Sequence, residues 1–504
     1  MDKVSISTPY SPTFAAPPKP RLRRHHWSRT DTITSVVIFC WALITRFVGL
    51  STAHVHNTPV FDEKHYAPQA WDIVNSWINP LLGGIESNPG YGLVVHPPLA
   101  KQLQALGEMI FGYTPLGWRF VAALFGAVLV VLIMDIARQL SRSTFVASAA
   151  GILALFDGVL LITSRYGMLD IFQTFFITAA CWALVRDWLQ VSSLMTNTGT
   201  SRLGPRVGYR WWRFTAGIFL GLALSVKWSG LYYMAFFGVV CVILDIRTRH
   251  RAGVASPIYG ALVRDAFKAF THLVIVPVLI YVYSWRAWFA TETAVYRHAA
   301  VDGTIDSNSL LHLLPESVAG WFYYHSSVLK FHASLTTSAG HDHPFDSKPW
   351  EWLIGGKPIL YYSANDLHCL GTSCTRMIYL FGTPALWWLT VPLLAWALWR
   401  WLIQHEWTLA LPVTCFLAGI VPWMIGYDRQ MYFFYAAPLA PMLIVFAALL
   451  LGTILNRYKN KGIWIVCGYL GLVVAQFVYF SPILYGYSVP TTVYNSLMWF
   501  DYWR

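Results

Sequence analysis

The chain has 504 residues, of which 56% are hydrophobic, 16% aromatic and only 12% charged, and its mean hydropathy is +0.47. Soluble domains carry about twice this share of charged residues, and long apolar runs recur here in place of polar linkers. This composition excludes a cytosolic enzyme, a disordered protein and a secreted disulfide scaffold. It predicts an all-α protein that crosses a membrane many times.

Residues 1–32 precede the first apolar run and are rich in Ser, Thr, Pro and Arg. They lack the apolar core and cleavage site of a signal peptide. We therefore expect a disordered cytoplasmic tail, followed by a first span that acts as an uncleaved anchor.

Eleven apolar runs approach the roughly 20 residues that a helix needs to cross a bilayer. The expected spans are 33–50, 118–137, 143–162, 171–189, 214–226, 231–246, 271–290, 376–399, 408–426, 431–455 and 463–485. The fifth and sixth are short and meet at Lys227-Trp228-Ser229-Gly230, so a single re-entrant pair is an alternative to two spans.

Basic residues predict the orientation of these spans, because cytoplasmic loops carry an excess of Lys and Arg. With the N-terminus inside, most of the 36 basic residues fall on the cytoplasmic side and most of the 24 acidic residues on the other. The basic clusters lie in the tail and in loops near 202–213, 247–268 and 457–461. The net charge of +12 therefore reflects topology and anionic lipid, not nucleic acid.

This topology divides the chain into an N-terminal transmembrane module (33–290) with a first external loop (51–117), a second external loop (291–375), C-terminal transmembrane helices (376–486) and an external tail (487–504). Both loops are longer than a connection requires, and long ordered loops are usually functional. We expect a protein of the cell membrane whose chemistry takes place on its outer side.

The first external loop contains two adjacent acids, Asp62 and Glu63, at the expected start of a helix. Apolar residues recur at helical spacing over 66–77, which indicates an amphipathic helix lying in the membrane interface. An ionised carboxylate here could act as a general base or a cation ligand. The alternative is a capping acid stabilised by the helix dipole, and the spacing alone favours the cap.

A second interfacial helix is expected after His96-Pro97-Pro98, because proline is tolerated in a first helical turn and apolar residues continue to Ile110. Lys101 lies near its start, and Arg119 follows at the mouth of the second span. Each alone is more typical of a capping or snorkelling residue than of a catalytic one.

Further ionisable residues stand at the external ends of spans: Arg165, Asp170, Lys227, Arg376, Asp428 and Arg429. Charges at membrane depth usually pair with one another or face a cavity. Several cations on one face suit an anionic lipid headgroup, so the set predicts a phosphate site; ordinary interfacial anchors are the alternative.

Five of the seven cysteines lie inside the expected spans, where they are packing residues. Cys369 and Cys374 share the second external loop, and an oxidising compartment favours a disulfide between them. Two free thiols are the alternative. No neighbouring His pair completes a zinc site.

The motifs together resemble those of protein O-mannosyltransferases, in the same order along almost the whole chain. The first half carries Phe61-Asp62-Glu63, His96-Pro97-Pro98-Leu99-Ala100-Lys101, Trp118-Arg119-Phe120, Met168-Leu169-Asp170 and Lys227-Trp228-Ser229-Gly230-Leu231. The second loop carries Leu314-Pro315-Glu316-Ser317, Gly320-Trp321, His325, Phe331-His332 and His343-Pro344-Phe345-Asp346-Ser347-Lys348-Pro349-Trp350. This loop is too short for the MIR domains of eukaryotic relatives, so the sequence resembles the actinobacterial, polyprenol-phosphate-mannose type.

The resemblance implies a GT-C glycosyltransferase fold with eleven spans and an external active site. It implies transfer of mannose from a polyprenyl-phosphate mannose to Ser or Thr of exported proteins, by a single displacement with inversion. Asp62 would be the general base, because an attacking hydroxyl must lose its proton. Glu63 would position a substrate or bind a cation.

The same resemblance extends to the residues that would bind the substrates. The leaving phosphate requires fixed cations, and the candidates are Arg119, Arg165, Lys227 and Arg429. The remaining expected substrate contacts are His96, Lys101, Asp170 and His343. No metal site is expected; a divalent cation remains an option that the mechanism does not require.

Two other functions stay open at this point. A GT-C enzyme could act on a lipid or a cell-envelope polysaccharide, and a transporter would share the many spans. Transporters tend to show internal repeats and ionisable groups at the midplane, neither of which is found here. The expected partners are the lipid donor, a protein acceptor and membrane lipid, with no nucleic acid; a link to the export machinery is left open.

Overall fold

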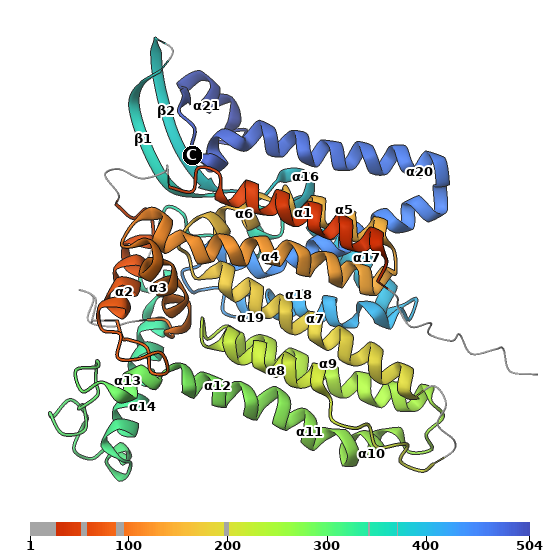
Figure 1. Ribbon diagram of the computed structural model, residues 1–504, viewed down its shortest axis with the longest axis horizontal. Helices are drawn as coiled ribbons and strands as arrows, with labels where there is room; N and C mark the ends of the chain where they lie inside the picture. Colours follow the sequence, from red (N-terminus) through yellow and green to blue (C-terminus); the bar gives the residue numbers. More distant parts are fainter. Residues whose placement is uncertain (1–26, 52–57, 87–94, 196–200, 341–342, 370) are drawn as a thin grey trace, which may run out of the picture.

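The computed structural model of the protein describes residues 27–51, 58–86, 95–195, 201–340, 343–369 and 371–504. Long helices lie side by side in one bundle, and short helices and a β-hairpin gather at one of its ends (Figure 1). Among the described residues six helices are long and apolar enough to cross a membrane, or seven if one bent pair is a single span. The helical membrane fold is confirmed, whereas the number of eleven spans is not.

The first part of the bundle is built around α4, which packs against α1, α5 and α7. The bounds are α1 (Arg29–Phe47), α4 (Pro115–Ser141), α5 (Thr144–Leu155), α6 (Gly158–Arg165) and α7 (Asp170–Leu194). The span predicted at 143–162 is bent by 59° between α5 and α6. The first helix ends at Leu155, and Asp157 caps the second, because its carboxylate accepts a hydrogen bond from the Leu160 amide at 3.0 Å.

The next helices are α8 (Trp211–Leu224) and α9 (Gly230–Arg251), which run as two separate helices side by side (Figure 1). They meet in a tight turn at Gly230, where a Cβ atom would lie only 2.7 Å from the Leu224 nitrogen. The following span begins earlier than the predicted residue 271. α10 (Pro257–Ala261), α11 (Phe267–Phe270) and α12 (Val276–Ser284) are joined by two π-helical turns into one helix of 28 residues.

A β-hairpin replaces the beginning of the span predicted at 376–399. β1 (Ile359–Cys369) pairs antiparallel with β2 (Thr372–Leu380), and β2 pairs with the short β3 (Val489–Pro490). The all-α prediction is wrong for this segment, because a run of Ile, Leu, Tyr and Thr suits a strand as well as a span. The helices that follow are α16 (Pro384–Trp387) and α17 (Thr390–Leu402).

The C-terminal part contains α18 (Ala410–Ala418), α19 (Val421–Ile425), α20 (Ala440–Tyr485) and α21 (Thr491–Leu497). A 3₁₀ segment, Phe433–Leu439, leads into α20. α20 consists of two helices joined at Lys459, whose backbone is not helical (φ 47°, ψ −118°). These two parts correspond to the spans predicted at 431–455 and 463–485.

Short helices from both predicted external loops, and one from the end of the span predicted at 271–290, gather at one end of the bundle (Figure 1). They are α2 (Glu63–Asn75), α3 (Leu99–Phe111), α13 (Arg286–Ala290), α14 (Glu316–Ser334) and α15 (Pro349–Trp352). α3 buries its small and polar face and exposes Leu106, Met109 and Ile110, with Ile110 69% exposed. Outward apolar side chains are what a helix lying in lipid requires.

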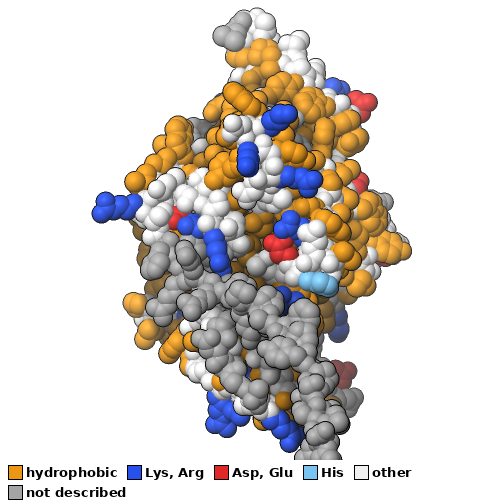
Figure 2. All heavy atoms as spheres, turned by 90° about the vertical axis from the view of Figure 1, so that its right-hand side faces the viewer, with side chains coloured by type: hydrophobic (Ala, Val, Ile, Leu, Met, Phe, Trp, Pro, Cys, Tyr) orange, Lys and Arg blue, Asp and Glu red, His pale blue; other side chains and the backbone are white. Residues whose placement is uncertain are grey.

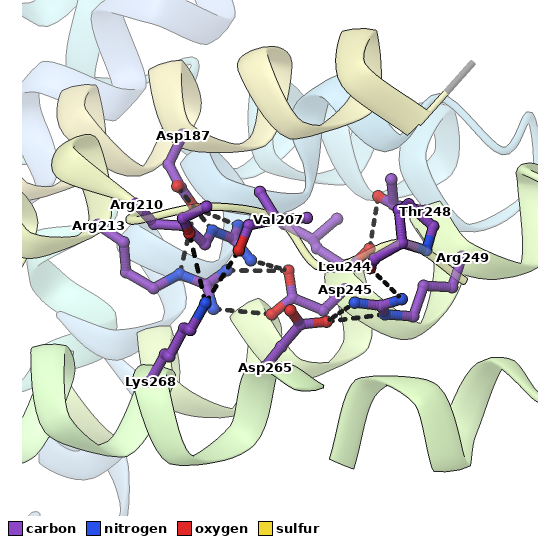
Figure 3. Close-up of polar contacts among 12 residues, drawn as sticks. Asp187, Val207, Arg210, Arg213, Leu244, Asp245, Thr248, Arg249, Asp265 and Lys268 are labelled. Carbon is purple, nitrogen blue, oxygen red and sulfur yellow. Dashed lines mark hydrogen bonds and ion pairs between the residues drawn. The ribbon is translucent and has the colours of Figure 1, made fainter. Parts of the chain in front are cut away.

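The opposite end carries the basic loops that the sequence predicts to be cytoplasmic, and Figure 2 shows more Lys and Arg than acidic side chains on it. Two of these arginines are not free charges (Figure 3). Arg210 and Arg213 are buried between Asp187 of α7 and Asp245 of α9, with Arg213 to Asp245 at 2.7 Å. The four charges balance one another and tie α7, α8 and α9 together.

Candidate active site

Asp62 lies at the start of α2 without capping it. Its backbone is helical and its side chain accepts no capping hydrogen bond, so the capping role considered from the sequence is not supported. Phe61 just before it has a φ of 51°, an unfavourable backbone conformation for an aromatic residue. The Phe61 ring stacks on Tyr361 of β1 with centroids 4.4 Å apart. This contact holds the strained turn that presents the carboxylate.

Burial makes the Asp62 carboxylate a stronger base than an ordinary aspartate. It raises the pKa of the carboxyl to about 6, while His65 and Lys227 act in the opposite direction. Desolvation disfavours the charged form, yet a group with this pKa is still mostly ionised at neutral pH. These are the properties required of a general base.

Glu63 is fully buried, and each of its two carboxylate oxygens accepts two hydrogen bonds. Arg119 donates to both of its oxygens at 2.7 Å, and the backbone amides of Gly167 and Val60 donate at 2.8 and 3.0 Å. Arg119 also donates to the carbonyl of Leu50 at 2.9 Å and is 1% exposed. The pair ties α2 to α4, so this geometry does not support substrate contact by Glu63 or phosphate binding by Arg119.

A cavity of about 260 Å³ brings together His96, Asp170, Lys227 and Arg429, four of the residues predicted from the sequence. Lys227 donates from Nζ to Oδ1 of Asp170 at 2.7 Å. The other oxygen of Asp170 is buried and has no hydrogen-bond partner among the described residues. Lys227 and Asp170, which line the cavity, both affect the pKa of Asp62, so the Asp62 carboxylate lies near this part of the cavity.

His332 of α14 fixes the position of Arg429 in this cavity. Arg429 donates to the His332 carbonyl at 3.1 Å and to Nδ1 at 2.9 Å. Since a guanidinium only donates, Nδ1 accepts, and Nε2–H is left to donate to the Val95 carbonyl at 3.1 Å. Burial and Arg429 lower the pKa of His332 to about 4, so the ring is neutral and serves to orient the arginine.

A second relay supports Trp228, the residue after Lys227. Trp228 donates to the Tyr281 hydroxyl at 2.9 Å, and this hydroxyl lies 2.6 Å from Nε2 of His325. His325 in turn uses Nδ1 to bond the Trp321 carbonyl at 2.7 Å. Burial lowers the pKa of His325 to about 4. α14 therefore braces the turn that carries Lys227.

One side of the cavity has an apolar rim. Leu231 and Leu329, which line it, are 50% and 60% exposed. The cavity therefore combines a cationic interior with an apolar exit, as an amphiphile with a charged head requires.

Three other predicted residues lie outside this cavity. Lys101 is fully buried and bonds Glu86 at 2.5 Å. Arg165 donates to carbonyls at the end of α1 and just beyond it, including that of Val48 at 2.7 Å, and so stabilises the C-terminus of that helix. His343 packs on Tyr432 with ring centroids 5.3 Å apart. The structure gives Lys101 and Arg165 structural partners, and their substrate contacts stay a prediction.

The disulfide predicted between Cys369 and Cys374 is present and closes the tip of the hairpin. Among the described residues no group of three His, Cys, Asp or Glu side chains is arranged to hold a metal ion. The residues that sequence reasoning missed are His332 and Tyr361. His332 lies in the Phe331-His332 motif, which could have indicated a role for this residue. No motif of the sequence pointed to Tyr361.

The arrangement defines a class of enzyme. A carboxylate with a raised pKa lies near a cavity that is lined by two cations and by exposed leucines, within a membrane bundle, and this arrangement suits a glycosyltransferase that uses a lipid-phosphate sugar. Two family descriptions match the chain: "Dolichyl-phosphate-mannose-protein mannosyltransferase" over residues 36–291 and "C-terminal four TMM region of protein-O-mannosyltransferase" over 317–503. The chain belongs to this family of protein mannosyltransferases.

Full-length relatives and a solved structure agree with this assignment. The chain is 58% identical to a polyprenol-phosphate-mannose–protein mannosyltransferase of Corynebacterium glutamicum, over 97% of each chain. It is 42% identical to the enzyme of the same name from Mycobacterium tuberculosis, over 98% of this chain and 95% of the other. The fold matches the Saccharomyces cerevisiae Pmt1–Pmt2 complex bound to the sugar donor, with a TM-score of 0.74 at 15% identity and coverage of 95% and 93%. The GT-C fold expected from the sequence is confirmed.

Proposed function

We propose that the enzyme transfers mannose from a polyprenyl-phosphate mannose to Ser or Thr hydroxyls of exported proteins, at the outer face of the plasma membrane, with Asp62 as general base. The observation that carries this proposal is the half-buried Asp62, with its pKa raised to about 6 and affected by the charges of Lys227 and Asp170, near a cavity that Lys227, Asp170 and Arg429 line. The names of the full-length relatives supply the sugar and the type of acceptor.

The reaction is a single displacement at the anomeric carbon. The acceptor hydroxyl oxygen forms a bond to this carbon while its proton passes to Asp62. The bond between the same carbon and the phosphate oxygen breaks, and the electron pair leaves with the phosphate. Because attack and departure occur on opposite sides, the configuration at this carbon is inverted.

The leaving phosphate acquires charge, which fixed cations must stabilise. Arg429, held by His332, and Lys227 would do this. The pairing of Lys227 with Asp170 keeps the ammonium in place at 2.7 Å. The apolar rim at Leu231 and Leu329 would receive the polyprenyl chain. We propose that these side chains suffice for a monophosphate and that no divalent cation is obligatory.

The test uses purified enzyme in liposomes, supplied with polyprenyl-phosphate mannose carrying a labelled sugar. Three acceptors are compared: a Thr-containing peptide, a glycolipid and a cell-envelope polysaccharide. We expect label on the peptide alone, with the anomeric configuration opposite to that of the donor, and the same rate after treatment with EDTA. Label on a non-protein acceptor in place of the peptide would refute the acceptor assignment.

A further inference from the structure

The β-hairpin has one edge to which no part of the described chain is bonded. The strand order is β1-β2-β3, so β2 is paired on both sides and also packs against α20 and α21. β1 is paired on one side only. Its 11 residues extend over roughly 36 Å at about 3.3 Å per residue, and Figure 1 shows it on the side of the hairpin away from α21.

The root of this edge lies at the active site. Ile359 is fully buried, and Tyr361 stacks on Phe61 and meets Tyr166 edge-on at 5.7 Å. Phe61 immediately precedes Asp62. Beyond Tyr361 the strand becomes accessible, and Ser363 is exposed. A chain bonded along β1 would therefore run directly to the general base.

The edge carries neither of two residue types that commonly block added strands, and its pairing with β2 is irregular between Leu360 and Tyr362 and between Ala364 and Leu367. Proteins commonly place Lys or Pro on such edges, and β1 has neither in its sequence Ile-Leu-Tyr-Tyr-Ser-Ala-Asn-Asp-Leu-His-Cys. The disulfide Cys369–Cys374 closes the tip, with Cα atoms 5.8 Å apart. It holds β1 to β2 whether or not a further strand is present, so the edge is already formed before anything binds.

We propose that the free edge of β1 binds the acceptor polypeptide as an added, extended strand and leads its Ser or Thr to Asp62. This inference rests on the proposed function and adds the acceptor site to it. Main-chain hydrogen bonds supply the affinity in this mode of binding. These main-chain hydrogen bonds do not depend on the side chains of the bound peptide. The edge therefore suits an enzyme whose acceptor is a polypeptide of no fixed sequence.

The test is a scan of an acceptor peptide by backbone N-methylation, one amide at a time, with the unmodified enzyme in liposomes. An added strand turns every second amide toward its partner. We expect the acceptor KM to rise about fivefold or more for alternate amides on one side of the Thr. For the amides in between, and for the donor KM, the change should stay below about twofold.

A photo-crosslinking experiment locates the peptide on the enzyme. The photoreactive residue benzoylphenylalanine replaces exposed Asn365 of β1 or, as the matched control, exposed Ser373 of β2. We expect crosslinks to the peptide from position 365 and far fewer from position 373. Crosslinks from position 365 to a second copy of the enzyme in place of the peptide would show that the edge is a homodimer contact and would overturn the proposal.

The two levels of inference fail in different ways. Transfer to the parent peptide together with a flat N-methyl scan would overturn edge binding alone. Absence of transfer from wild-type enzyme to the parent peptide would refute the proposed function, and edge binding with it.

Discussion

Replacement of Asp62 by Asn removes a proton acceptor and preserves the shape of the side chain. Loss of a general base lowers the rate by about 10²–10⁴-fold, or roughly 3–5 kcal/mol of barrier. In the wild type, protonation of Asp62 should lower kcat/KM below its pKa of about 6, approaching tenfold per pH unit. The residual rate of Asp62→Asn should not follow this profile.

The same substitution should not destabilise the fold. The pKa is raised from 3.8 to about 6, so the folded state carries a penalty at pH 7 that fades as the pH falls from 6 toward 4. Two units correspond to at most about 3 kcal/mol, and solvent near the half-buried group reduces this to on the order of 1–2 kcal/mol. Asn avoids this penalty, and no capping bond is lost. Asp62→Asn should therefore melt at the same temperature as wild type or higher.

The assay compares turnover and thermal melting of purified wild type, Asp62→Asn and Asp72→Asn in the same detergent and liposomes. Asp72 lies on the same helix, nine residues beyond its first residue Glu63, and serves as the matched control with wild-type activity. The expected result is an inactive, fully folded Asp62→Asn. Turnover within about threefold of wild type, or a wild-type pH profile in the variant, would refute the assignment of the base.

Four further outcomes follow from the structure. Glu63→Gln breaks a buried ion pair, which typically costs 3–5 kcal/mol, so the melting temperature and the yield should fall; an unchanged melting curve would contradict the structural role of the Glu63–Arg119 pair. Lys227→Met should raise the donor KM by about tenfold or more without changing the acceptor KM, and the reverse pattern would remove Lys227 from the phosphate site. Denatured, unreduced protein should show five free thiols, since Cys369 and Cys374 are bonded to each other; a count of seven would exclude the disulfide. A cysteine introduced at Arg206 should react with an impermeant reagent only after the cells are opened, and labelling in intact cells would invert the topology.

Helical spacing was sufficient to predict the two short helices of the first external loop, because each has its own local pattern. The apolar residues of α3 do not all face the protein interior, because Ile110 is exposed. An exposed apolar side chain is what a helix lying in lipid requires. Counting apolar residues failed at 376–399, since a buried strand and a membrane helix share the same residues. β2 pairs along its length with β1, which directly precedes it, and it pairs at two positions with β3, more than a hundred residues further along the chain.

The roles of the cations could not be separated by sequence, because each depends on the group placed opposite it by the fold. Arg119 and Arg429 occupy similar positions at the ends of spans. The first meets Glu63, 56 residues away, and is neutralised by it. The second meets His332, 97 residues away, and keeps its charge for the cavity. The distinction between a structural and a substrate-binding arginine is therefore made by long-range packing.

The apolar rim at Leu231 and Leu329 also determines on which scale the concentration of the donor should be expressed. A lipid that enters through this side reaches the cavity by lateral diffusion and never passes through water. Its chemical potential is then set by its mole fraction among the surrounding lipids, and the volume of the sample is irrelevant. Dilution of liposomes at a fixed donor-to-lipid ratio should leave the saturation of the donor site unchanged, whereas added phospholipid acts as a competitive diluent. Saturation curves for this enzyme should therefore plot the rate against the mole fraction of the donor in the membrane, which is a two-dimensional concentration.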